Sequence, residues 1–203
     1  ESLENGGRLY GSYSPMPKTF RTDASIDGQP IVQIDIKASY LSIRAGLAGQ
    51  SFEEGKDPYR LIPWVDHANP RTRDMAKQLV AMLIMSGGDK PRFPPGWKQE
   101  YSDLIGPRQT ITDFKGPVHQ TFPFLLEYLD GMEVMYHESE LMMDVLNTCI
   151  DQDLPAWPLH DCIFVREADA SKAVEIVKSS FANRFGYRVT VDAERNDGKK
   201  ITI

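Results

Sequence analysis

Two short apolar segments separated by only two residues constrain the fold of this chain most strongly. Pro155–Leu159 and Cys162–Val165 have only His160 and Asp161 between them. Strand-like segments this close predict a tight β-hairpin, because a two-residue connection can join antiparallel neighbours. Histidine followed by aspartate is unusual turn chemistry, so its presence at the tip indicates a function for these side chains. The chain therefore needs an antiparallel sheet with a polar pair at one end.

The rest of the chain supplies the other elements of an α+β fold. Alternating apolar and polar residues predict a strand over Pro30–Ile36, and further strands are expected over Tyr187–Asp192 and Lys200–Ile203. Residues 89–118 are rich in proline and glycine and are expected to be largely irregular. Helical spacing and end signals predict helices over Ser39–Leu47 (with Ser39 as N-cap), Arg71–Met85, Lys98–Leu104, Pro123–Leu129, Met132–Ile150 and Ala170–Phe185. We expect an antiparallel sheet with the helices on one face.

Length and composition exclude several classes of protein. At 203 residues and 41% hydrophobic content, the chain can bury a proper core, which argues against a disordered or fibrous protein. No apolar run approaches the roughly 18–20 residues of a membrane span, so no membrane partner is expected. Cys149 and Cys162 lack metal-ligand spacing. Their number and spacing favour a reducing, cytoplasmic compartment.

The net charge of −6 hides a strong local polarity. Arg71–Lys115 holds eight basic and five acidic residues, a net charge of +3. Residues 130–170 hold ten acidic residues and one arginine, a net charge of −9. Such a distribution is compatible with a polyanion bound at one place and divalent cations at another.

Two acidic residues stand out by their sequence context. Asp35 ends the strand expected over Pro30–Ile36, and Asp161 lies at the tip of the hairpin. Carboxylates close to buried strands are costly unless they are compensated, and a divalent cation shared by both would compensate them. The alternative is a surface turn residue and a salt-bridged strand end, and spacing alone leaves both interpretations open.

Four segments together resemble the polymerase motifs of the DNA polymerase I (A) family. Asp35–Ile43 (DIKASYLSI) resembles the first carboxylate motif of polymerase palms, and His160-Asp161 resembles the second, which the single-subunit phage RNA polymerases share. Arg73–Lys77, followed by an apolar stretch to Met85–Gly87, resembles the helix of the fingers. Gly7–Leu9, followed by a proline-rich segment, is similar to the segment that follows the primer end.

The resemblance implies a domain organisation and a fold. Residues 1–48 and 118–203 would form a palm with a ferredoxin-like antiparallel sheet, and residues 49–117 would form an abbreviated helical fingers subdomain. The implied function is template-dependent addition of deoxynucleotides to a primer 3′ end by a two-metal mechanism. The implied partners are a DNA primer-template, dNTPs and further domains or subunits of a replication complex in a bacterial, phage or plasmid context.

The resemblance also assigns roles to individual residues. Asp35 and Asp161 would be catalytic and would hold two Mg²⁺ ions, or Mn²⁺ in their place, together with the backbone carbonyl of Ile36. The nucleotide would be bound by Arg73 and Lys77 at its phosphates, by Tyr40 beneath its sugar and by the fingers-helix position of Met85. Arg8, His160 and Glu138 would contact primer or template.

Several of these residues also have simpler explanations. Tyr40 can be a packing aromatic, His160 a turn residue and Glu138 an exposed helix residue. Where DNA-polymerising relatives carry two aromatic residues on the fingers helix, this chain has Ala81 and Met85. That departure leaves open whether the chain checks the new base pair, and therefore its fidelity.

Three other functions remain open at this point. The same fold would suit a primase or another RNA-synthesising polymerase, although Tyr40 as a steric gate argues against it. A catalytically degenerate palm would serve as a nucleic-acid-binding or scaffold module. A phosphohydrolase that binds metal through His67, His119, His137 and the His160-Asp161 pair is disfavoured, because such sites are built on helices.

Overall fold

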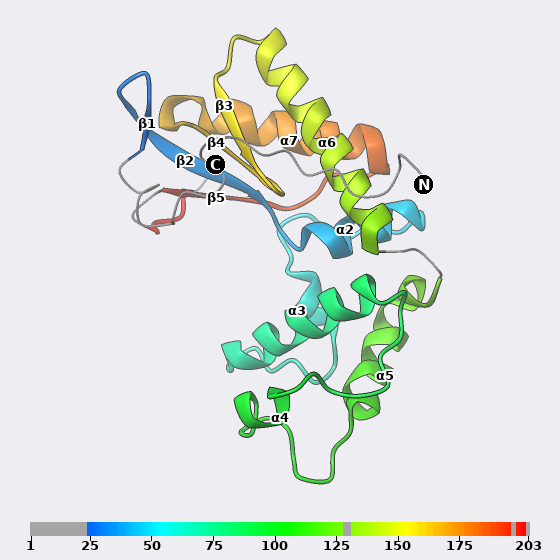
Figure 1. Ribbon diagram of the computed structural model, residues 1–203. Coiled ribbons are helices and arrows are strands. Elements are labelled where there is room, and N and C mark those ends of the chain that lie inside the picture. The colour runs from blue at the N-terminus through cyan, green and yellow to red at the C-terminus, as the bar shows by residue number, and fades with distance from the viewer. Residues whose placement is uncertain (1–23, 128–130, 196–197, 202–203) are drawn as a thin grey trace. The chain divides into compact units, whose positions relative to one another are not determined.

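The computed structural model describes residues 24–127, 131–195 and 198–201, and their chain folds into a mixed α+β structure (Figure 1). The described elements include five strands and six α-helices. In chain order they are β1 (Ser25–Ile26), β2 (Gln29–Ile36), α2 (Ser39–Leu47), η1 (Pro58–Leu61), α3 (Pro70–Met85), α4 (Trp97–Glu100), α5 (Ile111–Thr121), η2 (Pro123–Leu126), α6 (Gly131–Asp151), β3 (Ala156–Leu159), β4 (Cys162–Arg166), η3 (Glu167–Asp169), α7 (Ala170–Phe185) and β5 (Val191–Arg195).

The chain divides into two compact units. Of the described residues, those up to Lys56 and those from Met135 onward form one unit, the sheet unit, and those within Asp57–Val134 form the other, the helical unit. The sequence placed these boundaries after residues 48 and 117. Residues 118–134 belong to the helical unit because the chain around Gly88 is packed against them: a side chain at Gly88 would meet the Leu125 carbonyl oxygen at 2.3 Å. Whether the units are a palm and fingers stays a prediction.

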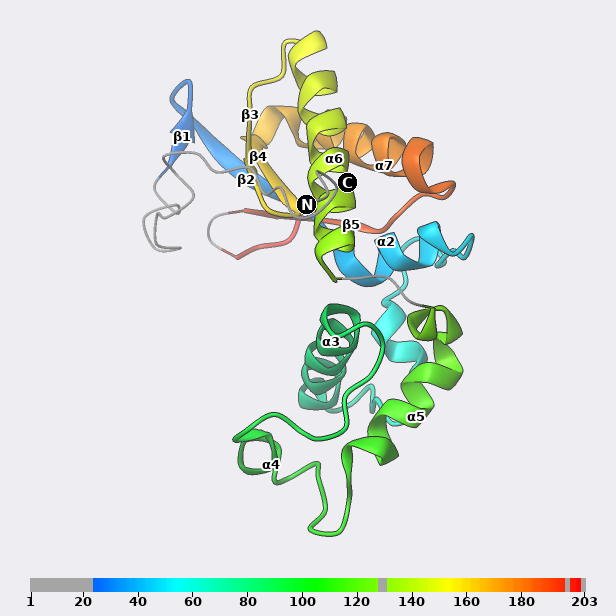
Figure 2. The same cartoon turned by 45° about the vertical axis from the view of Figure 1, so that its right-hand side comes forward.

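All strand pairs of the sheet are antiparallel, which confirms the expected fold class. β2 lies between β4 and β5, and β3 pairs with the other edge of β4 (Figures 1 and 2). β1 and β2 form a second hairpin around Asp27-Gly28, the turn expected from the sequence; both residues have positive φ (51° and 73°).

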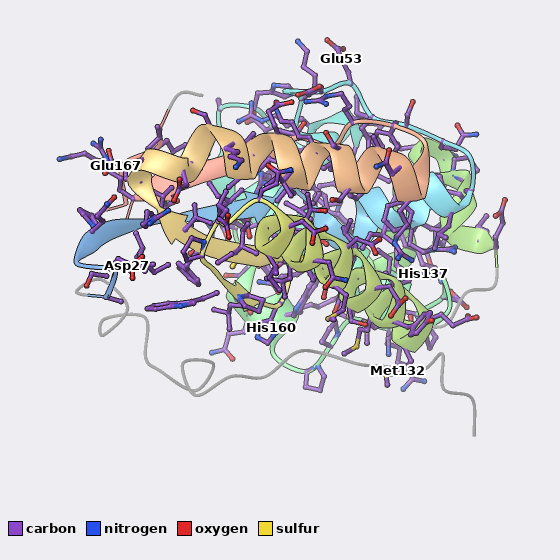
Figure 3. All side chains as sticks on the ribbon, turned by 90° about the horizontal axis from the view of Figure 1, so that it is seen from above. Asp27, Glu53, Met132, His137, His160 and Glu167 are labelled. Carbon is purple, nitrogen blue, oxygen red and sulfur yellow. The ribbon has the colours of Figure 1, made fainter. Side chains whose placement is uncertain are left out.

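The two faces of the sheet differ in what covers them. α7 packs against β2, β4 and β5, and α6 lies beside α7 on the same face (Figure 3). Val32, Ile34 and Ile36 of β2 are almost fully buried. Because side chains alternate along a strand, Gln33 and Asp35 point to the opposite face. That face also carries a small apolar cluster of Ile26, Ile31, Leu159, Cys162 and Phe164.

The helical unit is held by α3 and by a group of aromatic rings. Met75, Leu79 and Leu83 are fully buried along one side of α3, at the spacing that the sequence predicts. Trp64 meets Phe114 of α5 edge to face, with ring centroids 5.4 Å apart, and its Nε1 donates to the Phe114 carbonyl oxygen at 3.1 Å. These contacts tie α5 into the core of the unit.

Four sequence expectations about elements were wrong. Residues 111–118, expected to be irregular, lie in α5, and Pro123–Leu126 is a single 3₁₀ turn where a helix to Leu129 was expected. The strand expected over Tyr187–Asp192 begins only at Val191, and the Tyr187 hydroxyl donates to the Ser42 carbonyl oxygen of α2. Ser39 is the first helical residue of α2, and the N-cap is Ala38.

The chain ends also differ from expectation. Of the strand expected over Lys200–Ile203, the last two residues lie outside the described residues, and Lys200 forms an isolated bridge with Glu194. Arg8 lies outside the described residues. No described helix combines the length and the apolar character needed to cross a bilayer.

Candidate functional site

The tip of the β3–β4 hairpin places two polar residues at one end of the sheet. Leu159 and Cys162 face each other across the turn, and the Cys162 thiol donates to the Leu159 carbonyl oxygen at 3.1 Å. His160 is exposed and has a φ of 56°, in the left-handed region that glycine would adopt more easily. Asp161 is half-buried and has no positive φ. The turn thus retains a histidine at a position where its backbone is strained.

Asp35 lies beside this tip because of the pairing between β2 and β4. Asp35 faces Cys162 in the strand register, one residue from Asp161. Immediately beyond the paired strands, the Ile36 N–H donates to the Asp161 carbonyl oxygen at 3.3 Å. Asp35, near the end of β2, and Asp161, in the turn before β4, therefore lie at the same end of the sheet, although 126 positions separate them in the sequence.

A third acidic residue, which the sequence did not single out, belongs to this end of the sheet. Asp192 of β5 is directly opposite Asp35, so both side chains project from the same face. Like charges at opposed positions destabilise a sheet. Here two lysines compensate the charge of Asp192: its Oδ2 lies 3.5 Å from Lys37 Nζ and 3.2 Å from Lys200 Nζ. The sequence signal was an acid between Val191 and Ala193 in a strand, the same pattern that singled out Asp35.

α2 begins directly after β2 and holds Tyr40 in its first turn. Ala38 turns the chain into this helix with a φ of 52°. Ser39 is buried, and its hydroxyl donates to Glu138 Oε1 of α6 at 3.0 Å. Tyr40 is half-buried. The geometry thus connects the start of α2 to the middle of α6.

The interpretation of Glu138 as an exposed helix residue was wrong. Its side chain is buried, with 2% of the residue exposed, and it accepts the hydrogen bond from Ser39. Glu140, on the same helix, is partly exposed, and its Oε2 lies 3.9 Å from Arg184 Nη2. A carboxylate buried at this depth needs partners, so its identity matters to the local structure.

In the helical unit, α3 carries Arg73 and Lys77 one turn apart, as predicted. Arg73 Nε donates to the carboxylate of Asp57, and the guanidinium lies over the Tyr59 ring, 5.4 Å from its centroid. Lys77 is exposed and lines a cavity of about 460 Å³ together with Ala81. Met85, at the end of α3, is 45% exposed.

Among the described residues, no group of three or more His, Cys, Asp or Glu side chains is arranged to hold a metal ion. His67 Nδ1 lies 3.2 Å from Arg60 Nη1. Burial lowers the pKa of His119 below its usual value, although a hydrogen bond with the Gly88 backbone acts in the opposite direction and raises it. A metal ion held by Asp35 and Asp161 would complete its ligand shell with backbone carbonyl, substrate and water oxygens, the ligands Mg²⁺ commonly takes.

Comparison with known proteins gives a likeness of fold. No protein-family model matches the sequence, and no curated protein matches it. Among solved structures, the chain is similar to the POL domain of Pol1 from M. smegmatis in complex with DNA primer-template and dNTP, with a TM-score of 0.54 and 13% sequence identity. The match covers 97% of this chain and 44% of that chain, so this chain spans less than half the length of its structural neighbour. The fold is therefore similar to the polymerase domain of a DNA polymerase I.

Proposed function

We propose that this chain is a template-dependent nucleotidyltransferase that adds deoxynucleotides to the 3′ end of a DNA primer. The observation that carries the proposal is the pairing of β2 with β4, which brings Asp35 and Asp161 to one end of the sheet. The likeness to a polymerase domain whose structure contains primer-template and dNTP supports the same function.

In this proposal, Asp35, Asp161 and the Ile36 carbonyl would hold divalent metal, Mg²⁺ or Mn²⁺. Carboxylate and carbonyl oxygens are the hard ligands that these cations prefer. Bound metal would supply charge neutralisation at the primer hydroxyl and at the leaving pyrophosphate. The protein's own contribution is to hold Asp35 on β2 and Asp161 in the turn before β4, which pairs with β2, before substrate arrives, so that little reorganisation is needed.

We assign the phosphates of the nucleotide to Arg73 and Lys77. Arg73 has five N–H donors; Nε donates to Asp57 and Nη1 lies 4.0 Å from Asp74 Oδ1, beyond hydrogen-bond distance, so its Nη donors can be directed to a phosphate. Asp57 and the Tyr59 ring hold the guanidinium in one orientation, which lowers the entropic cost of binding. The exposed Lys77 adds a second cation one turn further along α3.

Tyr40 and His160 complete the assignment in the sheet unit. Tyr40, at the start of α2, would exclude a ribose 2′-hydroxyl through its ring. His160, exposed at the hairpin tip, would contact the primer terminus. Further domains or subunits would hold the duplex, because this chain spans less than half of its structural neighbour.

The decisive substrate test is primer extension by the purified chain with dNTPs or NTPs on DNA and RNA templates, with Asp161→Ala in parallel. We expect Mg²⁺-dependent incorporation of dNTPs on a DNA template and none by Asp161→Ala. Preferential use of NTPs would assign the chain to RNA synthesis or priming. Nucleic-acid binding without incorporation under any condition would contradict the proposal and favour a scaffold role.

A further inference from the structure

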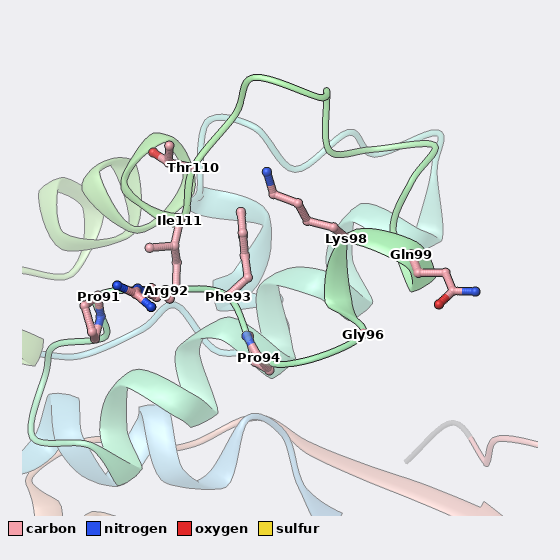
Figure 4. Close-up of a pocket in the computed structure, with 9 residues that line it drawn as sticks. All are labelled: Pro91, Arg92, Phe93, Pro94, Gly96, Lys98, Gln99, Thr110 and Ile111. Atoms are coloured by element: carbon pink, nitrogen blue, oxygen red, sulfur yellow. The ribbon is translucent and has the colours of Figure 1, made fainter.

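The helical unit contains a second cavity, separate from the residues assigned above. Its volume is about 580 Å³, within the usual range for ligand sites. One wall is the loop before α4 together with α4 itself, and the other is the start of α5 (Figure 4). The lining residues are Pro91, Arg92, Phe93, Pro94, Gly96, Lys98, Gln99, Thr110 and Ile111.

The charge of this cavity is positive. Arg92 and Lys98 line it, and none of its nine lining residues is acidic. Both side chains are exposed, and neither forms an ion pair within the part of the chain that the structure describes. Two uncompensated cations at one cavity favour an anionic ligand.

The aromatic wall of the cavity is held rigidly. The Phe93 ring packs against Trp97 and Phe114, with centroid distances of 6.1 and 5.9 Å. Lys98 Nζ lies over the Phe93 ring, 5.8 Å from its centroid, in a cation–π contact that an anionic ligand could draw away. In the view of Figure 4, Arg92 and Lys98 lie on opposite sides of this ring. An aromatic ring with a cation at each side matches a ligand in which bases alternate with phosphates.

The start of α5 argues against a compact polyphosphate, such as a triphosphate, as the ligand of this cavity. Asp113 Oδ2 accepts hydrogen bonds from Thr110 N at 2.7 Å and from Thr110 Oγ1 at 3.0 Å. These bonds hold the pKa of Asp113 below its usual value, so the helix N-terminus is already capped by an ionised carboxylate. A compact triphosphate would meet that negative charge, whereas a strand would place its phosphates at Arg92 and Lys98.

We infer that this cavity binds a segment of single-stranded DNA, with its phosphates at Arg92 and Lys98 and a base against Phe93. The choice of DNA as the strand rests on the proposed function. The cationic and aromatic lining that makes the site does not depend on it.

The test is fluorescence anisotropy with the full chain and a labelled single-stranded DNA of about 12 nucleotides, a length in the usual range for such sites. The main variant is Arg92→Ala with Lys98→Ala, both exposed positions. The matched control removes one charge elsewhere, Lys56→Ala, an exposed lysine of the sheet unit. We expect the double variant to bind about tenfold more weakly. The slope of log affinity against log salt should fall by about 1.4, or about 0.7 for each phosphate that is no longer neutralised.

Phe93→Leu tests the stacking of a base while keeping an apolar side chain in the aromatic group. We expect it to weaken binding of the DNA and to leave binding of an abasic strand of equal length unchanged. Wild-type affinity and salt slope in the Arg92/Lys98 double variant, or a decrease in affinity no larger than in Lys56→Ala, would overturn the inference. Equal affinity for an acidic peptide of the same net charge, with the same dependence on both cations, would also overturn it.

These outcomes are separable from failure of the proposed function. If the chain incorporates no nucleotide but the double variant binds DNA more weakly as expected, the cavity inference stands alone. If the chain extends primers and the double variant binds single strands normally, the cavity inference fails alone.

Discussion

At the scale of residues, His160 combines an exposed side chain with an unfavourable backbone conformation. A φ of 56° costs a residue with a Cβ about 1 kcal/mol, and glycine in place of His160 would form this two-residue turn with less strain. The hairpin nevertheless has histidine and aspartate at its tip. Strain retained at an exposed polar position is consistent with a role for the side chain.

Tyr40 gives the residue-scale prediction about substrate choice. Tyr40→Ala should raise incorporation of ribonucleotides relative to deoxyribonucleotides by about tenfold or more, because the ring no longer occupies the space of the 2′-hydroxyl. Competition assays with matched dNTP and NTP measure the ratio. Tyr40→Phe keeps the ring and should keep the ratio; an unchanged ratio in Tyr40→Ala would reject the steric-gate role.

Glu138 gives a residue-scale prediction about stability. Glu138→Ala removes the acceptor of the buried Ser39 hydroxyl, so the free energy of unfolding should fall by about 1–3 kcal/mol. Glu138→Gln keeps an oxygen for that bond and should cost less. The control is Glu140→Ala on the same helix, which should change stability by no more than about 0.5 kcal/mol. Equal urea-unfolding midpoints for the two alanine variants would contradict the structural role of Glu138.

At the scale of elements, the sequence predicts best where local chemistry marks the ends. α3 begins as expected because Asn69 Oδ1 accepts from Arg71 N at 3.1 Å, and α7 ends at Gly186, whose φ is 82°. α5 was missed even though Thr110 and Asp113 form a capping box, because Gly116 and Pro117 inside it resemble loop residues. Its stability comes from packing against Trp64, which no local pattern reveals.

The candidate site was predictable only in part for the same reason. The sequence patterns of Asp35 and Asp161 drew attention to both, but their adjacency depends on the register of β2 against β4. The burial of Glu138 and the position of Asp192 opposite Asp35 depend entirely on tertiary pairing. Side chains whose role arises from such pairing leave no signal in the sequence of their own element.

α5 also gives a prediction about pH. Because burial lowers the pKa of His119, the unfolded chain binds a proton there more readily than the folded chain. Stability from neutral His119 is therefore present above its ordinary pKa of about 6.5 and is lost as pH falls through its lower folded value. His119→Gln should reduce the fall in unfolding free energy between about pH 7 and pH 5. Chemical unfolding at several pH values in this range measures the free energy of unfolding. The same dependence on pH in the wild type and in His119→Gln would contradict the assignment.

At the scale of the whole molecule, charge is divided between the two units. The sheet unit carries −5 of the net charge of −6, and the helical unit carries −1. In the proposed function, attraction for a nucleic acid would therefore come from local groups, such as the cations at the cavity near Phe93, and from metal bound at the acidic end of the sheet. We expect weak, strongly salt-dependent binding of DNA by this chain alone.

The central claim is that Asp35 and Asp161 act together in nucleotide addition. The most direct measurement is the rate of single-nucleotide incorporation at saturating Mg²⁺ for Asp35→Asn and Asp161→Asn. The matched control is Asp153→Asn. Asp153 is exposed, lies before β3 and has a left-handed backbone conformation, which asparagine also adopts readily. We predict that each site variant loses at least about 10³-fold in rate, or about 4 kcal/mol of transition-state stabilisation, while the control and the fold are unchanged. Wild-type incorporation by either site variant would contradict the account.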